Sequence, residues 1–437
     1  MTQNFDLQPA TRVSGIVAVP GDKSISHRAL MLSGIADGDS RVSGFLASED
    51  CLATLAAMRA LGVAIDQSAA TEVTIHGVGR NGLKAPGKPL DMGNAGTAMR
   101  LFMGLLSGQA FNSRLIGDES LTRRPMERVA IPLREMGAHV HTRDGKPPVD
   151  IGGPCTLHGI RYRMPIASAQ VKSAILLASL YAEGSTEVTA PAVTRDHTEL
   201  MLAGAGAVVV TTSDLRTSLS VPLGLKPQNI TVPGDFSSAA FFIVAGLLAA
   251  PAPGLLIRNV GMNPTRIGLL HILRSMGGDI EVLEARFSGR EPVADLRVRA
   301  SKLRGVTVQG DTVALAIDEI PVLFIAAACA EGLTIVTGAE ELRVKESDRI
   351  AAMSAGLTTL GVVHSVMPDG MCIEGRPEGA GFGGGVIDSF GDHRIAMAFA
   401  VASLRASAPI RVLNVANVAT SFPGFVPLAA SIGISIS

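Results

Sequence analysis

A pattern that recurs six times along the chain constrains its fold more than any other feature. In each copy an apolar helical segment ends at a glycine, and a short alternating or apolar stretch follows at once. Glycine readily adopts the left-handed conformation that ends many helices. The glycines that mark the copies are Gly62, Gly137, Gly206, Gly277, Gly361 and Gly433. The repeat predicts stacked helix-and-strand units, which need such glycines whatever they catalyse.

A second and more apolar series of helices alternates with the first. Its members are expected to begin near Ser24, Asn94, Ser168, Ser237, Asp318 and His393. Short strands are expected at 72–76, 208–212 and 296–298. The sequence Val-Pro-Gly-Asp occurs at 19–22 and again at 232–235, and each copy opens a serine-containing helix. The chain is therefore expected to be an α/β protein with repeated units in two halves.

Length and charge narrow the class of protein further. A chain of 437 residues exceeds what one hydrophobic core usually supports, so two domains are expected. A net charge of −1 gives no long-range attraction for nucleic acid or for anionic membranes, and neither is expected as a partner. The cysteines are too far apart for a zinc site and are expected to be reduced and structural. They are Cys51, Cys155, Cys329 and Cys372.

No targeting or membrane-spanning segment is expected. The N-terminus carries Asp6 and lacks the apolar run of a secretory signal, which predicts a cytoplasmic location. The uncharged stretch 239–257 is nearly long enough to span a bilayer. Pro251, Pro253 and Gly254 interrupt it, so we expect a helix of ordinary length followed by a turn.

Charged and polar side chains gather where helices begin, although the helix bodies carry almost no charge. Helix N-termini offer unpaired N–H groups and a positive dipole end, which suit anions. In the second series these residues are Lys23, Ser24, Arg28, Asn94, Gly96, Thr97, Ser168, Ala169, Gln170, Lys172, Asp318, Glu319, Asp392, His393 and Arg394. The first series adds Arg124, Arg195, Lys345, Glu346, Ser347, Asp348 and Arg349.

Each of these charges alone is more often solvated or paired with a neighbour, as Arg195 could be with Asp196. Their occurrence at matching points of a repeated unit favours a shared site. Guanidinium and ammonium groups, close backbone approach at glycine and a few carboxylates suit a substrate that carries phosphate and carboxylate. Because the cations lie in both halves of the chain, we expect the halves to close around the ligand and exclude water.

Six motifs, in order and spacing, resemble those of the 5-enolpyruvylshikimate-3-phosphate (EPSP) synthase family of enolpyruvyl transferases over nearly the whole chain. They are GDKSISHRALML, GNAGTAMR, RRPM, SAQVKSAILLA, VKESDR and DHRIAMAFA. The resemblance implies a two-domain inside-out α/β barrel of six βαβαββ units. The first domain would combine residues 1–19 with 236–437 and the second would span 20–235. The active site would lie in the cleft between them, with hinges near the two Pro-Gly-Asp turns.

The family's activity would be transfer of the enolpyruvyl group of phosphoenolpyruvate to the 5-hydroxyl of shikimate 3-phosphate, a step of the shikimate pathway to chorismate and the aromatic amino acids. The resemblance implies no metal and no other cofactor. A monomer is expected. Glyphosate occupies the phosphoenolpyruvate site in this family, so it is the expected inhibitor.

Site residues follow from the motifs by resemblance. The shikimate 3-phosphate ligands would be Lys23, Ser24, Arg28, Ser168, Ala169, Gln170, Arg195, Asp318 and Lys345. The phosphoenolpyruvate ligands would be Lys23, Asn94, Gly96, Arg124, Gln170, Arg349 and Arg394. Asp318 and Glu346 are the candidates for general acid and base, with Lys23 assisting, because carboxylates in a crowded cationic pocket can have suitable pKa values. Which residue moves which proton stays open, and ion pairing with Lys345 or Arg349 is the alternative role of both carboxylates.

Two departures from the family pattern resemble its class II branch, which includes glyphosate-tolerant members. Thr420 stands where many members have lysine, so it is assigned no cationic role. Ala169 stands where many have serine, and Arg195 is expected to make the missing phosphate contact. Gly96 favours inhibition, since a methyl group at this position obstructs glyphosate.

Three other functions compete with this assignment. The enolpyruvyl transferase acting on UDP-N-acetylglucosamine typically has Lys-Asn in the first motif and a cysteine on a mobile loop, whereas this chain has Lys23 followed by serine. A Gly-x-Gly-x-x-Gly sequence at 77–82 fits dinucleotide binding, but a non-helical stretch follows it, so a strand-end turn is expected. A non-catalytic relative is disfavoured by the joint presence of Asp318, Glu346, Lys23 and Arg124.

Overall fold

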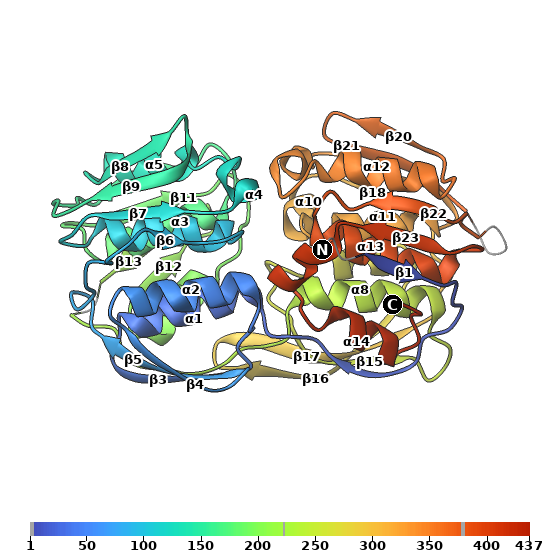
Figure 1. Cartoon of the computed structure of the whole chain (residues 1–437), viewed down its shortest axis with the longest axis horizontal. Helices are drawn as coiled ribbons and strands as arrows, with labels where there is room; N and C mark the ends of the chain where they lie inside the picture. Colours follow the sequence, from blue (N-terminus) through green and yellow to red (C-terminus); the bar gives the residue numbers. More distant parts are fainter. Residues whose placement is uncertain (1–3, 222, 377–380) are drawn as a thin grey trace. The chain divides into compact units, whose positions relative to one another are not determined.

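The computed structural model describes residues 4–221, 223–376 and 381–437 and divides them into two compact units. Unit 1 comprises the N-terminal segment to Pro20, Pro233–Phe287 and Pro292–Ser437. Unit 2 comprises Gly21–Val232 and the hairpin tip Ser288–Glu291. Each unit has its own hydrophobic core. In Figure 1 unit 2 runs from blue to green, and unit 1 takes most of the yellow-to-red part of the chain.

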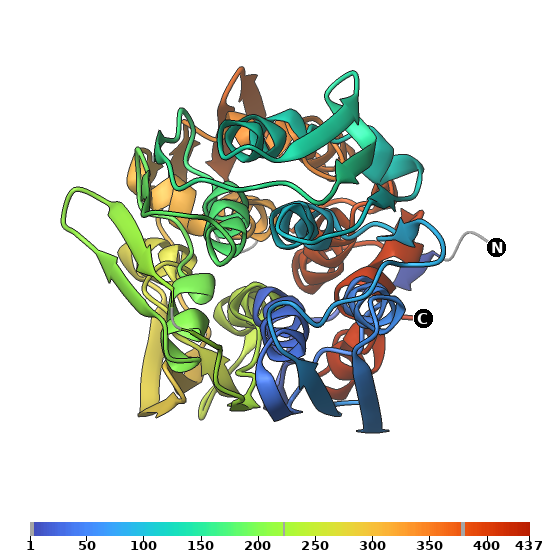
Figure 2. The same ribbon diagram turned by 90° about the vertical axis from the view of Figure 1, so that its left-hand side faces the viewer.

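Unit 2 is built from three sheets and the helices that pack on them. Its helices are α1 (Lys23–Gly34), α2 (Glu49–Ala60), α3 (Gly96–Ser107), α4 (Glu119–Thr122), α5 (Glu127–Glu135), α6 (Ala169–Ser179) and α7 (His197–Gly204). Its strands are β3 (Asp37–Ser43), β4 (Ala64–Ala69), β5 (Glu72–Val78), β6 (Leu90–Asp91), β7 (Ser113–Ile116), β8 (His139–Arg143), β9 (Lys146–Gly152), β10 (Arg161–Arg163), β11 (Thr186–Thr189), β12 (Val208–Thr211), β13 (Arg216–Ser220) and β14 (Asn229–Thr231). Figure 2 shows these blue-to-green strands on the outside of the unit and helices within it.

Unit 1 repeats this plan. Its helices are α8 (Phe236–Ala249), α9 (Gly268–Ser275), α10 (Asp311–Ala316), α11 (Ile320–Ala328), α12 (Arg349–Thr359), α13 (His393–Ala402) and α14 (Phe425–Ser431), with 3₁₀ helices η1 (Glu340–Val344), η2 (Ser403–Arg405) and η3 (Val415–Thr420). Its strands are β1 (Phe5–Leu7), β2 (Gly15–Ala18), β15 (Leu255–Gly261), β16 (Asp279–Ser288), β17 (Glu291–Arg299), β18 (Thr307–Val308), β19 (Gly332–Val336), β20 (His364–Met367), β21 (Gly370–Gly375), β22 (Gly385–Asp388) and β23 (Ile410–Leu413).

The sheet topology shows the sixfold repeat directly. In the described residues the strand orders are β14-β3-β5-β4, β6-β7-β9-β8, β10-β11-β13-β12, β16-β17-β15-β2, β18-β19-β21-β20 and β1-β23-β22. Every sheet contains one parallel pair, at one edge, and antiparallel pairing beyond it. Five four-stranded sheets and one three-stranded sheet, each with this parallel pair at an edge, confirm the α/β class and the repeated unit that the glycine pattern predicted.

The predicted helix boundaries are confirmed. All six helix-ending glycines have left-handed φ values between 72° and 109°, and each lies just beyond the last residue of a helix. The apolar helices α1, α3, α6, α8, α11 and α13 begin within two residues of the predicted starts. These boundaries depend on caps and chain-breaking residues close in sequence, which is why the sequence reveals them.

Two segments whose sequences allowed another interpretation, the uncharged stretch 239–257 and the glycine motif 77–82, fold as expected. The uncharged stretch begins in α8 and then turns before β15, and no helix among the described residues is long and apolar enough to cross a membrane. Strand β5 ends at Val78, and residues 79–89 contain turns and irregular structure without a helix. The glycine motif therefore lacks the helix that dinucleotide binding requires.

The four cysteines lie within the described residues and form no disulfide. Burial raises the pKa of the Cys51 thiol above its ordinary value and that of Cys329 to about 12. Both thiols are therefore protonated and unreactive near neutral pH, as a structural role requires.

Candidate active site

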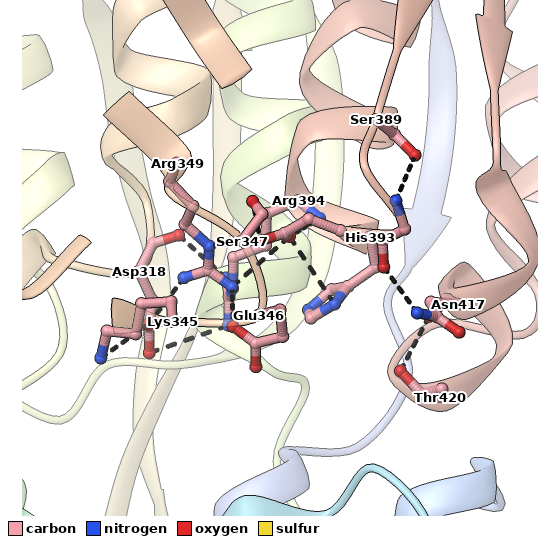
Figure 3. A network of polar contacts seen from close by, with 12 residues as sticks. Asp318, Lys345, Glu346, Ser347, Arg349, Ser389, His393, Arg394, Asn417 and Thr420 are labelled. Carbon is pink, nitrogen blue, oxygen red and sulfur yellow. Dashed lines mark hydrogen bonds and ion pairs between the residues drawn. The ribbon is translucent and has the colours of Figure 1, made fainter. Parts of the chain in front are cut away.

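Unit 1 brings six charged side chains together where helices α11, α12 and α13 begin (Figure 3). This unit 1 cluster consists of Asp318, Lys345, Glu346, Arg349, Asp392 and Arg394. Three carboxylates thus face three cations. Five of the six were predicted as site residues from their motifs, and the structure places all five in one network.

Arg349, the first residue of α12, is the centre of this cluster, and its side chain is only 1% exposed. Its Nε donates to Oδ2 of Asp392 at 2.8 Å, Nη2 donates to Oε2 of Glu346 at 2.5 Å, and Nη1 lies 3.4 Å from Oδ1 of Asp318. Burial alone would lower the pKa of Arg349, but the three carboxylates raise it above its ordinary value. The guanidinium is therefore always charged and is fixed in orientation.

Asp318 lies in the turn before α11 and is shared by three cations. Besides its contact with Arg349, it lies 3.9 Å from Nζ of Lys345 and 3.8 Å from Nη2 of Arg394. Nη1 of Arg394 also donates to the Asp318 backbone carbonyl at 3.0 Å. Burial lowers the pKa of Lys345, although Asp318 acts in the opposite direction. Lys345 therefore releases a proton more readily than an ordinary lysine does.

The two candidate acid–base carboxylates contact different nitrogens of one guanidinium, Asp318 at Nη1 and Glu346 at Nη2 of Arg349. The Glu346 and Asp318 side chains are 21% and 15% exposed, so each keeps part of its surface accessible while it contacts Arg349. The ion pairs that formed the alternative explanation for these residues are therefore present. An ion pair orients a carboxylate and does not prevent proton transfer, so the acid–base roles stay a prediction.

Asp392 is the member of the unit 1 cluster to which the sequence assigned no role. It is fully buried and caps α13 by accepting from the Arg394 backbone N–H at 2.9 Å. Its other oxygen accepts from Arg349 and, at 3.2 Å, from the Ser347 hydroxyl. Asp392 thereby links the start of α13 to the start of α12. Its partner lies 43 positions earlier in the chain, and no local pattern could have shown this pairing.

Unit 2 contains a second group of polar side chains at the starts of α1 and α3 and around them. We call these residues the unit 2 cluster; they comprise the ion pair of Lys23 with Asp50 and a set of residues in mutual contact, Asn94, Gly96, Arg100, Arg124 and Gln170. Five of its members were predicted. The sequence did not single out Asp50 or Arg100.

Two guanidinium groups lie beside the start of α3. Nη2 of Arg124 donates to Oδ1 of Asn94 at 2.5 Å, and Nη1 of Arg100 donates to Oε1 of Gln170 at 2.6 Å. A Cβ atom added at Gly96 would lie 3.0 Å from Nη1 of Arg124 and 3.3 Å from Nη1 of Arg100. The missing side chain at Gly96 therefore leaves both cations close to the backbone, as anion binding at a helix N-terminus requires.

Lys23, the first residue of α1, forms an ion pair with Asp50 of α2. The Lys23 side chain is 20% exposed, whereas that of Asp50 is 5% exposed. A buried carboxylate that holds the lysine from one side limits the directions in which its ammonium group can point. Asp50 is thus a positioning partner that lies 27 residues away in the sequence.

Arg28 is 3% exposed and donates to three neutral oxygen atoms. Nε bonds to the Thr198 hydroxyl at 2.6 Å, Nη2 to the Ser173 hydroxyl at 2.8 Å and Nη1 to the Ser24 carbonyl at 2.9 Å. These contacts join α1, α6 and α7 inside unit 2. The predicted contact between Arg28 and a substrate carboxylate is not tested by these bonds and stays a prediction.

The third apolar helix of unit 2 begins as its motif predicted. Ser168 caps α6 by accepting from a backbone N–H in the first turn at 3.4 Å, and Ala169 is the first helical residue. Lys172, in the first turn of α6, forms an ion pair with Glu199, and both are 5% exposed. Arg195 is half-buried in the loop before α7. Lys172 is therefore one partner of a buried ion pair inside unit 2.

Thr420, at the end of η3, is 4% exposed, and its hydroxyl donates to the Asn417 carbonyl at 2.7 Å (Figure 3). It therefore makes a local contact where many family members have a lysine. Among the described residues no group of three His, Cys, Asp or Glu side chains is arranged to hold a metal ion.

Comparison with known proteins gives consistent results over the whole chain. Residues 7–428 match the model of the family described as EPSP synthase (3-phosphoshikimate 1-carboxyvinyltransferase). A 3-phosphoshikimate 1-carboxyvinyltransferase of Methylococcus capsulatus is 57% identical over 433 residues, covering 99% of this chain and 98% of that protein. One from Alkalilimnicola ehrlichii is 55% identical, with 99% and 96% of the two chains covered.

Solved structures show the same similarity. The EPSP synthase of Acinetobacter baumannii superposes with a TM-score of 0.89 at 51% identity, covering 100% of this chain and 99% of that one. The enolpyruvyl transferase NikO of Streptomyces tendae superposes with a TM-score of 0.78 at 18% identity, which shows a shared fold alone.

The six-sheet fold and the two charged clusters define an α/β enzyme for small anionic substrates. With these matches, the chain belongs to the EPSP synthase family. It catalyses the enolpyruvyl transfer step of the shikimate pathway, in the synthesis of aromatic amino acids.

Proposed function

We propose that the unit 1 and unit 2 clusters serve one reaction, in which the enolpyruvyl group of phosphoenolpyruvate passes to the 5-hydroxyl of shikimate 3-phosphate. The observation that supports this most strongly is the shared guanidinium of Arg349. This guanidinium contacts Asp318 and Glu346, and both carboxylates are partly accessible. Lys345 lies beside them, and its burial lowers its pKa. Groups able to give and accept protons are thus collected within one network of cations.

The reaction has an addition and an elimination step. In the addition, the 5-hydroxyl oxygen bonds to C2 of phosphoenolpyruvate, a base takes the hydroxyl proton, and an acid delivers a proton to C3. In the elimination, C3 loses a proton, the bond from C2 to the phosphate oxygen breaks, and inorganic phosphate leaves. Asp318 and Glu346 exchange these protons, with Lys23 assisting. The order in which they act is open.

The unit 1 cluster binds parts of both substrates. Arg349 and Arg394 hold the carboxylate of phosphoenolpyruvate, for which planar guanidinium groups are suited. Asp318 and Lys345 meet the ring hydroxyls of shikimate 3-phosphate. Because Arg349 already contacts three carboxylates, substrate binding replaces part of its contact with Glu346 or Asp318, which leaves that carboxylate available for proton transfer.

The unit 2 cluster binds the phosphate end of phosphoenolpyruvate. Lys23, Arg124 and Gln170 meet this phosphate, with Asn94 and Gly96 beside it. The arrangement of two guanidinium groups at the start of α3 supports this role, since anions are favoured at a helix N-terminus.

Residues on α1, on α6 and before α7 bind shikimate 3-phosphate. Ser24 and Arg28 meet the carboxylate, and Ser168, Ala169 and Arg195 meet the phosphate, with Lys23 and Gln170 lying between the two substrates. Arg195 makes the contact that a second serine makes in other family members. Glyphosate competes for the phosphoenolpyruvate site. A monomer and a cytoplasmic location remain predictions.

The test is phosphate release by Glu346→Gln and Asp318→Asn, which keep size and remove the ionisable group. A proton-transfer role typically contributes about 10²- to 10⁴-fold to the rate, so kcat should fall by such a factor. Asp279→Asn is the matched control, because Asp279 is a 53% exposed unit 1 carboxylate paired with Arg299. Its kcat should change less than about twofold, as expected for an exposed ion pair. Wild-type kcat in both cluster variants would refute the acid–base assignment.

A further inference from the structure

The turn that leads into α13 has an unusual backbone conformation. Residues 388–392 join β22 to α13, and within this turn Phe390 and Gly391 have φ values of 53° and 70°. A left-handed conformation is uncommon for a residue with a bulky side chain, and surrounding contacts must hold it. The contacts that hold this turn are therefore of functional interest, because the turn ends at Asp392.

The segment around η3 contacts this turn at three points, and Figure 3 shows the one made by Asn417. The Ser389 hydroxyl donates to the Asn414 carbonyl at 2.9 Å. Nδ2 of Asn414 donates to Oδ1 of Asp388 at 2.8 Å. Nδ2 of Asn417 donates to the Gly391 carbonyl at 2.6 Å, which makes it the contact nearest to the start of the helix.

The residue after Gly391 is the buried Asp392, which accepts from Nε of Arg349 at 2.8 Å. Arg394 follows two residues later and donates to the Asp318 carbonyl at 3.0 Å. The position of the Gly391 peptide thus sets the start of α13, and with it the carboxylate that holds Arg349 and the backbone that carries Arg394. Asn417 touches neither guanidinium group and acts on both through the turn.

We propose that Asn417 is a positioning residue for the two arginines that bind the carboxylate of phosphoenolpyruvate, an inference that rests on the proposed function of Arg349 and Arg394. The Thr420 hydroxyl helps to hold Asn417 in place, since it donates to the Asn417 carbonyl at 2.7 Å. Thr420 thus contacts Asn417 within η3, and Asn417 in turn contacts Gly391.

The experiment compares KM for phosphoenolpyruvate with KM for shikimate 3-phosphate in Asn417→Ala. Loss of one partly buried hydrogen bond that positions two ligands should raise KM for phosphoenolpyruvate about tenfold and leave KM for shikimate 3-phosphate within about twofold. Asn417→Gln keeps an amide donor and should recover part of the loss. A general loss of folding would not separate the two KM values in this way.

Two further variants keep the test decisive. Asn112→Ala is the matched control, because Oδ1 of Asn112 accepts from the Gly153 backbone N–H at 3.1 Å in unit 2, and both KM values should stay at wild type. Thr420→Val preserves the shape of the side chain and removes the hydroxyl that holds Asn417, so it tests the same positioning role with less risk to folding. It should raise KM for phosphoenolpyruvate about threefold, which is the effect of a partly lost hydrogen bond.

Arg394→Lys separates this inference from the function on which it rests. If Arg394→Lys raises KM for phosphoenolpyruvate while Asn417→Ala and Thr420→Val leave it unchanged, the positioning role is wrong and the site stands. If Arg394→Lys itself leaves KM unchanged, the proposed carboxylate site is wrong. Equal changes of both KM values in Asn417→Ala would also overturn the positioning role, since they would indicate a general structural effect.

Discussion

Replacement of Arg124 by alanine should weaken the transition state of the reaction by about 2 to 4 kcal/mol. Arg124 is 8% exposed, and one of its terminal nitrogens would lie 3.0 Å from a Cβ placed at Gly96. Its guanidinium is therefore held next to the start of α3 with little access to water. Each charge-assisted hydrogen bond is worth about 1.5 to 3 kcal/mol, so one or two bonds to a substrate phosphate give this range.

The corresponding fall in kcat/KM is about 30-fold to 1,000-fold, since each 1.4 kcal/mol is a factor of ten. The assay is continuous detection of phosphate release with each substrate varied in turn. An interaction that forms only in the transition state lowers kcat, whereas one that is equal in ground and transition states raises KM. The assay thus also shows at which stage Arg124 acts.

Arg123→Ala is the matched control, because it changes the same residue type one position earlier. The Arg123 side chain is 72% exposed and pairs with Glu119, which is 84% exposed. Its loss should change kcat/KM by less than about twofold. If Arg124→Ala retained a kcat/KM within about threefold of wild type, which is less than half of the free energy of one charge-assisted hydrogen bond, Arg124 would not be a substrate ligand.

Two other predictions concern inhibition and pH. Glyphosate should inhibit the enzyme, and Gly96→Ala should weaken that inhibition because the new methyl group would lie 3.0 Å from Nη1 of Arg124; unchanged inhibition constants in the variant would disprove this. The pKa of His76 should lie above 6.5, because Asp66 and Asp39 accept from its two ring nitrogens. The contacts of the protonated His76 ring with the two carboxylates should therefore stabilise unit 2 fully below pH 6.5, and this stabilisation should be lost as the pH rises through the raised pKa. An NMR titration of the ring measures this pKa. In Asp39→Asn the pKa should return toward 6.5, and a wild-type titration curve there would contradict the explanation.

The fold was predictable where local chemistry decides it. Each helix-ending glycine, such as Gly62 or Gly361, can be recognised from its own neighbours, because the left-handed cap is a local requirement. The starts of the apolar helices were predictable for the same reason. The repeated spacing of these signals then indicated six similar units, which the sheets confirm.

The candidate site was predictable only as a set of motifs. Arg349 and Glu346 are three residues apart on one motif, and their contact could be expected from sequence. Asp392 and Asp50 hold Arg349 and Lys23 from 43 and 27 residues away, so only the tertiary structure reveals them. No local pattern indicates these two pairs, because the partners are far apart in the chain and a buried carboxylate has no periodic spacing.

The most direct test of the account is phosphorus NMR of the purified chain mixed with equal amounts of phosphoenolpyruvate and shikimate 3-phosphate. We expect the signals of phosphoenolpyruvate and shikimate 3-phosphate to be replaced, in equal amounts, by those of inorganic phosphate and a new phosphomonoester. The rate should fall sharply both in Arg124→Ala of unit 2 and in Glu346→Gln of unit 1, because both clusters serve one reaction. Wild-type turnover in either variant would show that its cluster has no part in the transfer.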